Sequence, residues 1–179
     1  VLLFGAKFIS VEETENRPNL DAYIQAITSK TRAIFICNPN NPTGYYYTES
    51  EILEFLSKVP QNILVFIDEA YSEFATAKDY PKLLSQLEKF PNPMLNRTFS
   101  KIYGLAGVRV GYAFSNSEVI KALWKVKPPF DVNLAAQAAA EAALSDDDHI
   151  QKTLDMNNAG NAQLTKAFTN LGYKVLPTQ

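Results

Sequence analysis

A lysine flanked by hydroxyl residues and followed by an arginine marks the stretch where side-chain chemistry concentrates. In residues 98–111, Thr98 and Ser100 precede Lys101, and Arg109 follows eight residues after the lysine. Hydroxyl groups and a planar guanidinium suit the binding of phosphate oxygens. The lysine amine is then free for covalent chemistry, and pyridoxal phosphate is one ligand that needs both. Taken alone, the stretch indicates a phosphate site, with a solvated surface lysine as the alternative.

Two apolar runs earlier in the chain also end in polar side chains. Residues 33–37 lead into a proline-fixed loop that contains Asn41, and residues 63–67 lead into Asp68 and Tyr71. Such runs are typical of strands covered on both faces. Ligands of open α/β sheets bind at the carboxyl ends of the strands. If the strands are neighbours, these side chains meet the lysine at one rim of the sheet.

Each of these residues has a role in pyridoxal phosphate chemistry and an ordinary structural alternative. Asp68, expected at the end of a buried strand, could pair with a protonated pyridine nitrogen or cap the next turn. Tyr71 and Asn41 could hydrogen-bond the ring's 3-oxygen, or be a half-buried tyrosine and a turn asparagine. Lys101 would form the Schiff base and then move a proton between substrate and cofactor.

Strands alternate with helices along the chain, which predicts an α/β fold with a mostly parallel sheet and flanking helices. Besides the two apolar runs, strands are expected over residues 7–11, 93–98 and 108–114. Helices are expected over residues 20–28, 48–59, 82–90, 115–124, 133–144 and 146–171.

Polar residues at the helix starts indicate where several of these helices begin. Thr48 with Glu51, and Ser115 with Glu118, match the capping-box pattern. Asn133 is a further candidate cap for an alanine-rich helix.

Three consecutive aspartates, residues 146–148, suit the start of the long helix better than a metal site, because no spaced oxygen ligands follow them. We therefore expect no metal. His149, the sole histidine, is interpreted as a solvated residue at the helix start, and Cys37 as a small core residue.

Composition narrows the function classes. The chain has 179 residues, 46% hydrophobic and 20% charged, with a net charge of -2, which fits one sizeable core and gives no nucleic-acid signature. The single cysteine excludes an internal disulfide and favours a reducing compartment. No apolar run has the length of a membrane span, and no signal peptide is visible.

The ends of the chain predict an incomplete polypeptide, since it does not begin with Met and a strand is expected to start at residues 175–179. The expected organisation is a partial cofactor-binding large domain over residues 1–148. A linker helix and the start of a truncated small C-terminal domain then occupy residues 149–179.

Three motifs together resemble those of the fold-type I aminotransferases of classes I and II. They are Asn38-Pro-Asn-Asn-Pro-Thr-Gly44, Asp68-Glu-Ala-Tyr71 and Thr98-Phe-Ser-Lys101-x-Tyr-Gly-Leu-Ala-Gly-x-Arg109-x-Gly-Tyr112. Within that family the chain is most similar to the histidinol-phosphate aminotransferases. Residues 128–133 also match that subfamily, less specifically. The resemblance covers nearly the whole chain.

The resemblance implies a homodimeric cytoplasmic enzyme that transfers an amino group between histidinol phosphate and 2-oxoglutarate in histidine biosynthesis. It also implies that seven residues bind pyridoxal phosphate: Asn41 and Tyr71 at the 3-oxygen, Asp68 at the ring nitrogen, Thr98, Ser100 and Arg109 at the phosphate, and Lys101 as the Schiff base. The family's substrate-binding arginine and its partner-subunit tyrosine lie outside these residues, so the isolated fragment is expected to be inactive.

Other proteins of this fold share these motifs and stay open as alternatives. They are the aromatic amino-acid aminotransferases, threonine-phosphate decarboxylase, and the aminotransferase-like sensor domain of a transcription regulator. The enzyme readings involve small-molecule substrates and neither nucleic acid nor membrane.

Overall fold

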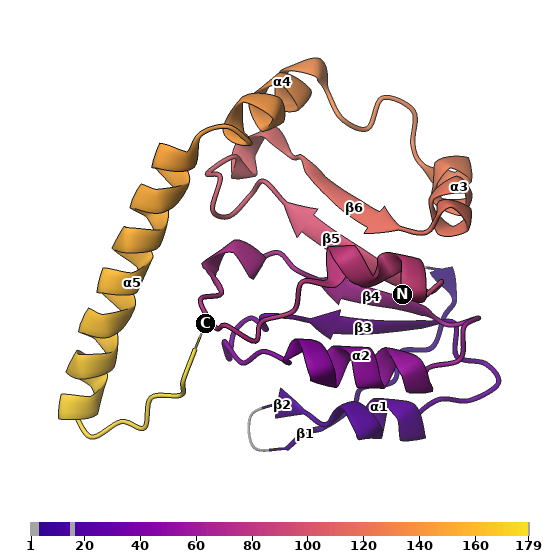
Figure 1. Ribbon diagram of the computed structural model, residues 1–179, viewed down its shortest axis with the longest axis horizontal. Helices are drawn as coiled ribbons and strands as arrows, with labels where there is room; N and C mark the ends of the chain where they lie inside the picture. Colours follow the sequence, from indigo (N-terminus) through magenta and orange to yellow (C-terminus); the bar gives the residue numbers. More distant parts are fainter. Residues whose placement is uncertain (1–3, 15–16, 179) are drawn as a thin grey trace.

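A four-stranded sheet forms the centre of the fold in the computed structural model, which describes residues 4–14 and 17–178 (Figure 1). The strand order is β3-β4-β5-β6, and β3, β4 and β5 run parallel while β6 is antiparallel to β5. The mostly parallel α/β sheet predicted from the sequence is therefore confirmed. The strands are β3 (Ala33–Cys37), β4 (Leu64–Asp68), β5 (Pro93–Thr98) and β6 (Gly111–Ser115).

The register of the sheet brings the strand ends that carry the candidate site residues to the same side of the sheet. Cys37 pairs with Asp68 across β3 and β4, and Asp68 pairs with Asn96 across β4 and β5. On the far side of β5, Thr98 lies opposite Gly111. The two strands assumed to be neighbours are thus adjacent, and the strand before the lysine lies next to them.

One face of the sheet carries the hydrophobic core. Ile34 and Ile36 of β3, with Val65 and Ile67 of β4, point into a cluster that also contains residues of α2 (Glu49–Lys58). The short helix α1 (Leu20–Gln25) packs beside α2. The 3-10 helix η3 (Leu83–Lys89) adds Leu83 to the same cluster.

The opposite face of β3 is exposed, which corrects the prediction that both faces of this strand are covered. Phe35 is 53% exposed and stacks on Phe66 of β4, with ring centroids 4.7 Å apart. Cys37 follows the same alternation and is exposed, so its assignment to the core was wrong. Side chains of a strand alternate between its two faces, and Phe35 and Cys37 lie on the face opposite Ile34 and Ile36.

Two helix starts were predicted as capping boxes, and the structure confirms one of them. At α2, Thr48 Oγ1 accepts from the Glu51 amide at 3.3 Å, and Glu51 Oε2 accepts from the Thr48 amide at 2.8 Å. Helix α3 (Ser117–Val126) begins instead at Asn116, whose side chain accepts from the Val119 amide. Ser115 belongs to β6, where its hydroxyl donates to the Pro93 carbonyl at 2.7 Å and is not free to cap.

Two other strands expected from the sequence differ in the structure. Residues 7–11 form no strand, because no described strand lies beside them, and the nearest pairing is the short ribbon of β1 (Glu13–Thr14) and β2 (Arg17–Pro18). The strand expected over residues 108–114 starts only at Gly111. A 3-10 turn, η4 (Ala106–Val108), precedes it, and Arg109 follows that turn with a left-handed φ of 60°.

The last two helices match the sequence-based expectation closely. Helix α4 (Leu134–Ala143) is capped by Asn133, and α5 (Asp147–Asn170) begins at Asp146, whose carboxylate accepts from the His149 amide at 3.1 Å. Capping is therefore confirmed for the aspartate run. Figure 1 shows α5 extending along one side of the molecule, away from the sheet.

The segment after α5 returns toward the sheet and contains no strand over residues 173–178. The strand expected over residues 175–179 is therefore absent from its described part, and residue 179 lies outside the described residues. The Thr178 side chain occupies the space that a Cβ on Gly44 would need. The tail thus packs against the end of the proline loop.

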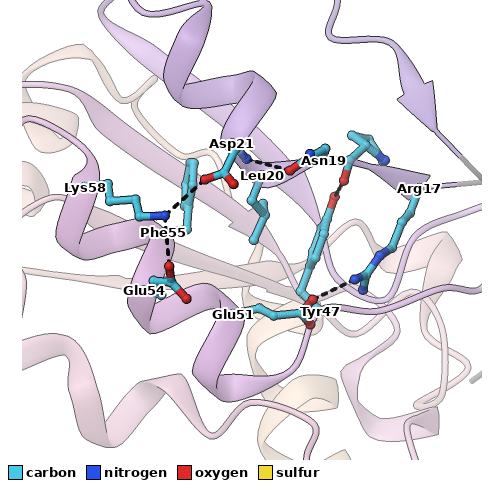
Figure 2. A pocket seen from close by; sticks show the side chains of 10 residues that line it. Arg17, Asn19, Leu20, Asp21, Tyr47, Glu51, Glu54, Phe55 and Lys58 are labelled. Atoms are coloured by element: carbon cyan, nitrogen blue, oxygen red, sulfur yellow. Dashed lines mark hydrogen bonds and ion pairs between the residues drawn. The ribbon is translucent and has the colours of Figure 1, made fainter.

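Paired charges line a hollow of about 450 Å³ between α1, α2 and β2 (Figure 2). Arg17 contacts Glu51 at 2.7 Å, and Lys58 contacts Asp21 at 3.1 Å and Glu54 at 2.9 Å. Exposed pairs of this kind add little to stability, because water and salt screen them. The hollow is therefore interpreted as the boundary, here called the seam, along which α1 and β2 contact α2 through ion pairs.

None of the helices in the described ranges has the length and apolarity that a bilayer crossing requires.

Gly111 should be essential to the spacing of β5 and β6. A Cβ at this position would lie 2.8 Å from the Arg97 carbonyl oxygen, which is backbone and cannot swing away. We expect Gly111→Ala to lower the free energy of unfolding by about 1–3 kcal/mol, measured by urea denaturation. The control is Gly160→Ala in α5, where nothing lies within 4 Å, and there we expect a gain of up to about 1 kcal/mol. Equal stability of the Gly111 variant and wild type would contradict the close approach.

Candidate functional site

A pocket of about 410 Å³ opens where β4 and β5 end. Its walls come from the end of β4, the end of β5 and the turn that follows β5. Five of the seven residues predicted from the sequence line it, together with four others. The predicted residues are Asp68, Thr98, Ser100, Lys101 and Arg109, and the others are Ala70, Asn96, Arg97 and Ala106.

The turn after β5 groups hydrogen-bond donors at one end of the pocket. Thr98 Oγ1 accepts from the Ser100 amide at 3.1 Å, which folds the hydroxyls of both residues into a tight turn. Arg109 donates through Nη1 to the Ala106 carbonyl at 2.7 Å. A guanidinium has five N–H donors, so this bond leaves others to meet an anion. Together these groups suit a phosphate.

The remaining two predicted residues reach the pocket through the lysine. The Lys101 ammonium lies 5.2 Å from the centre of the Tyr71 ring, a cation–π distance. Asn41 donates from Nδ2 to the Tyr71 hydroxyl at 2.8 Å. Tyr71 thus connects Lys101 of the pocket to Asn41 of the proline loop. All seven predicted residues therefore belong to one continuous cluster.

Asp68 is exposed at the end of β4, which corrects the expectation of a buried carboxylate. Its Oδ1 accepts from the Ala70 amide at 3.0 Å, the turn-capping bond that was the structural alternative. One carboxylate oxygen is bound in this way, and the residue still lines the pocket. Val65 and Ile67 point into the core, so Asp68 lies on the opposite face of β4, where it is exposed.

The proline loop depends on Asn38, a residue to which sequence reasoning gave no role. Asn38 is 1% exposed, accepts from the Tyr47 amide at 2.7 Å and donates to the Tyr47 carbonyl at 3.2 Å. Its own amide donates to the Asp68 carbonyl at 2.9 Å. Asn38 therefore fixes the base of the loop that carries Asn41. Its place directly after an apolar strand was the available signal.

A buried ion pair also escaped the sequence reasoning. Glu69 is 1% exposed, and its Oε2 accepts from Arg97 Nε at 2.8 Å. Burial raises the pKa of the Glu69 carboxyl, and the Arg97 guanidinium opposes that rise. Each partner adjoins a predicted site residue in the sequence, which was the only signal available.

His149 has a structural contact that its interpretation as a solvated residue did not include. Its Nε2 lies 3.0 Å from the Ile102 carbonyl oxygen, next to the lysine. The ring also lies 3.6 Å from where a Cβ on Gly104 would stand, and Gly104 has a left-handed φ of 69°. This contact joins the start of α5 to the lysine turn, 47 residues earlier in the chain.

Within the described ranges, no three His, Cys, Asp or Glu side chains gather in a way that could hold a metal ion.

Comparison with known proteins places the chain in a family. Residues 3–179 match the family Aminotransferase class I and II. Histidinol-phosphate aminotransferase 1 of Nitrosococcus oceani is 45% identical over 178 residues, which are 99% of this chain and 48% of that protein. The chain thus spans about half the length of the curated relatives it matches.

Solved structures show the same fold. Histidinol-phosphate aminotransferase from Sinorhizobium meliloti, in complex with pyridoxal-5'-phosphate, superposes with a TM-score of 0.91 at 29% identity and covers 97% of this chain and 47% of its own. L-threonine-O-3-phosphate decarboxylase from Porphyromonas gingivalis gives 0.70 at 25% identity over 82% of this chain and 44% of its own. Both carry the architecture described above.

The Cys37 thiol offers a probe of the charge on Asp68. Partial burial of the sulfur and then the Asp68 carboxylate raise the pKa of this thiol, so less thiolate is present at a given pH. Asp68→Asn removes the negative charge, and the pKa should fall. Since the thiolate is the nucleophile, we expect faster alkylation by iodoacetamide at about pH 8. Asp21→Asn, on the far side of the sheet, is the control. Equal alkylation rates in both variants would contradict the proximity of the Asp68 carboxylate to the Cys37 thiol.

Proposed function

The chain belongs to the class I and II aminotransferases, and we propose that it forms the cofactor-binding part of a pyridoxal phosphate-dependent aminotransferase. The observation that carries the proposal is the pocket in which a lysine, a carboxylate, two hydroxyls and an arginine meet. This donor set matches the chemical groups of the cofactor one by one. When bound, the cofactor supplies a ring that withdraws electrons from the substrate carbon bearing the amino group.

The phosphate end of the pocket fits through charge and geometry. Thr98 and Ser100 offer hydroxyls within one turn, and Arg109 adds a cation with free N–H groups. Charge-assisted hydrogen bonds of this kind are short and strong. We propose that these three residues hold the phosphate and thereby fix the position of the ring.

The other end of the pocket fits a protonated ring nitrogen. The Asp68 carboxylate lines the pocket with one oxygen bonded to the Ala70 amide. Its negative charge would hold a proton on the nitrogen, as an opposite charge favours the charged form of its neighbour. The hydrogen bond to Ala70 fixes the direction in which the carboxylate points.

Lys101 lines the same pocket and would supply the reactive amine. Its ammonium lies over the Tyr71 ring, and Tyr71 is held by Asn41. We propose that the amine would hold the cofactor at its aldehyde carbon and, when free, would carry the proton to and from the substrate carbon. Tyr71 and Asn41 would then hydrogen-bond the 3-oxygen of the ring.

For the substrate, we propose histidinol phosphate as amino donor and 2-oxoglutarate as acceptor, in histidine biosynthesis. Support comes from the names of relatives 44–45% identical to this chain. The second candidate is decarboxylation of a phosphorylated amino acid. It has the weaker structural match to L-threonine-O-3-phosphate decarboxylase as support.

The family resemblance of the sequence motifs also implies an organisation for the whole protein. We propose a cytoplasmic homodimer in which residues 1–148 belong to the large domain and residues 149–179 lead into a small domain. Helix α5 supports this division, since none of its described residues is buried against the sheet. Residues that select the substrate would lie in the roughly equal length that this chain does not span. The fragment alone is then inactive.

Lys101→Ala tests the proposed chemistry in the full-length protein. We expect the variant to lose borohydride-dependent attachment of pyridoxal phosphate, detected by mass spectrometry of the peptide that contains residue 101. The transamination rate should fall by about 10²–10⁴-fold or more, because the residue that moves the proton is gone. Lys125→Ala, exposed on α3, is the control. Labelling of the Lys101 variant at the wild-type level would sink the assignment.

A single-turnover screen tests the substrate. Full-length protein loaded with pyridoxal phosphate is mixed with one amine at a time, and formation of pyridoxamine phosphate is followed by absorbance. Histidinol phosphate should react faster than phenylalanine or tyrosine, and threonine phosphate should release no carbon dioxide. A preference for the unphosphorylated aromatic amino acids would move the assignment to an aromatic aminotransferase.

A further inference from the structure

We infer that Glu69 and Arg97 are a positioning pair, which fixes the spacing of the strand ends that carry Asp68 and Thr98. The inference rests on the proposed function, because it concerns the cofactor pocket those two residues line. Neither partner is assigned a contact with the substrate or the reacting atoms.

The pair joins the two strands at the wall of the pocket, which Arg97 itself lines. Glu69 directly follows Asp68 at the end of β4, and Arg97 directly precedes Thr98 at the end of β5. Their side chains meet at 2.8 Å, and the Glu69 amide also donates to the Asn96 carbonyl at 2.8 Å. A side-chain bond and a backbone bond therefore cross the same gap between the strands. The distance from Asp68 to Thr98 follows from both.

Burial makes the side-chain bond hard to replace. Glu69 is 1% exposed, and its other oxygen, Oε1, has no hydrogen bond to any residue that the structure describes. Arg97 is thus the cation that compensates this carboxylate. When one partner of a buried pair is lost, an uncompensated charge remains, whereas replacing both by apolar groups is often tolerated. That asymmetry allows a positional role to be separated from a stabilising one.

Strand β6, on the side of β5 away from β4, also contacts Arg97. In the register of the sheet Arg97 lies opposite Tyr112 of β6, and its guanidinium lies 6.0 Å from the centre of the Phe114 ring. Glu69 and Tyr112 both raise the pKa of Arg97, while burial lowers it. The arginine is therefore fixed by β4 and β6 together, and a shift of Glu69 would be transmitted to the β5 strand end.

An exposed ion pair elsewhere in the chain provides a matched control. Lys58 and Glu54 of α2 lie 2.9 Å apart, nearly the same distance, but their side chains are 43% and 68% exposed. They lie at the seam between α1 and α2, on elements that contribute no residue to the cofactor pocket. Replacing them removes this pair and the bond from Lys58 to Asp21, and leaves the strand ends untouched.

The test compares variants of the full-length protein by two measurements. These are the thermal midpoint of the apoprotein and the dissociation constant for pyridoxal phosphate, followed by fluorescence. The variants are Arg97→Met alone, Glu69→Leu with Arg97→Met, and the control Glu54→Leu with Lys58→Met. Arg97→Met alone should give the lowest midpoint, and the Glu69 and Arg97 double variant should recover most of the loss.

The recovered double variant and Arg97→Lys together decide the inference, because Arg97 also lines the pocket and only the lysine variant keeps its charge there. We expect its dissociation constant for pyridoxal phosphate to rise by about tenfold or more, and kcat to fall with little change in KM, because misplaced groups lose the reacting geometry. The control pair should leave both values at the wild-type level. A double variant that regains its midpoint and binds the cofactor like wild type overturns the positional role.

A second variant covers the case in which the double variant does not fold. Arg97→Lys keeps the positive charge and loses the planar fork that meets Glu69. We expect this variant to fold and to bind the cofactor more weakly than wild type. Wild-type cofactor binding by Arg97→Lys would overturn the positional role. Absence of cofactor binding by the wild-type full-length protein contradicts the proposed function itself, and this inference with it. That outcome is distinct from equal binding by wild type and variant.

Discussion

The parallel pairing of β3, β4 and β5 is the interaction on which the rest of the structure depends. Its register aligns Cys37, Asp68 and Asn96 across three strands, so the chain leaves the sheet three times at one edge. Polar residues that would be scattered in another pairing meet there. The pocket follows from this alignment, since parallel strands leave a crevice beyond their carboxyl ends.

A second set of polar residues, led by the buried Asn38 and Glu69, supports the side chains of the pocket. Asn38 fixes the proline loop through Tyr47, and Glu69 joins Arg97 across the gap between β4 and β5. Buried polar groups are costly unless they are paired, so a paired set enforces a single arrangement of the strands around it. The accessible side chains do not pack into the core and owe their positions to these buried partners.

Local signals predicted the elements well where a single segment determines its own form. The capping box at Thr48, the cap at Asn133 and the strand over residues 93–98 were correct, because turn chemistry and burial patterns act within a few residues. Failures came where a distant segment intervenes. The Ser115 hydroxyl is taken by Pro93, and residues 7–11 have no strand beside them among the described residues.

The sequence by itself determined the chemical content of the site: a lysine, an arginine and two hydroxyls within one turn, and a carboxylate directly after an apolar strand. Those facts depend on residue identity and short spacing. Tertiary structure decided that Asp68 is exposed, that Asn41 reaches Tyr71, and that Glu69 meets Arg97. These contacts join residues about 30 positions apart, and only the register of the sheet sets which residues become neighbours across that distance.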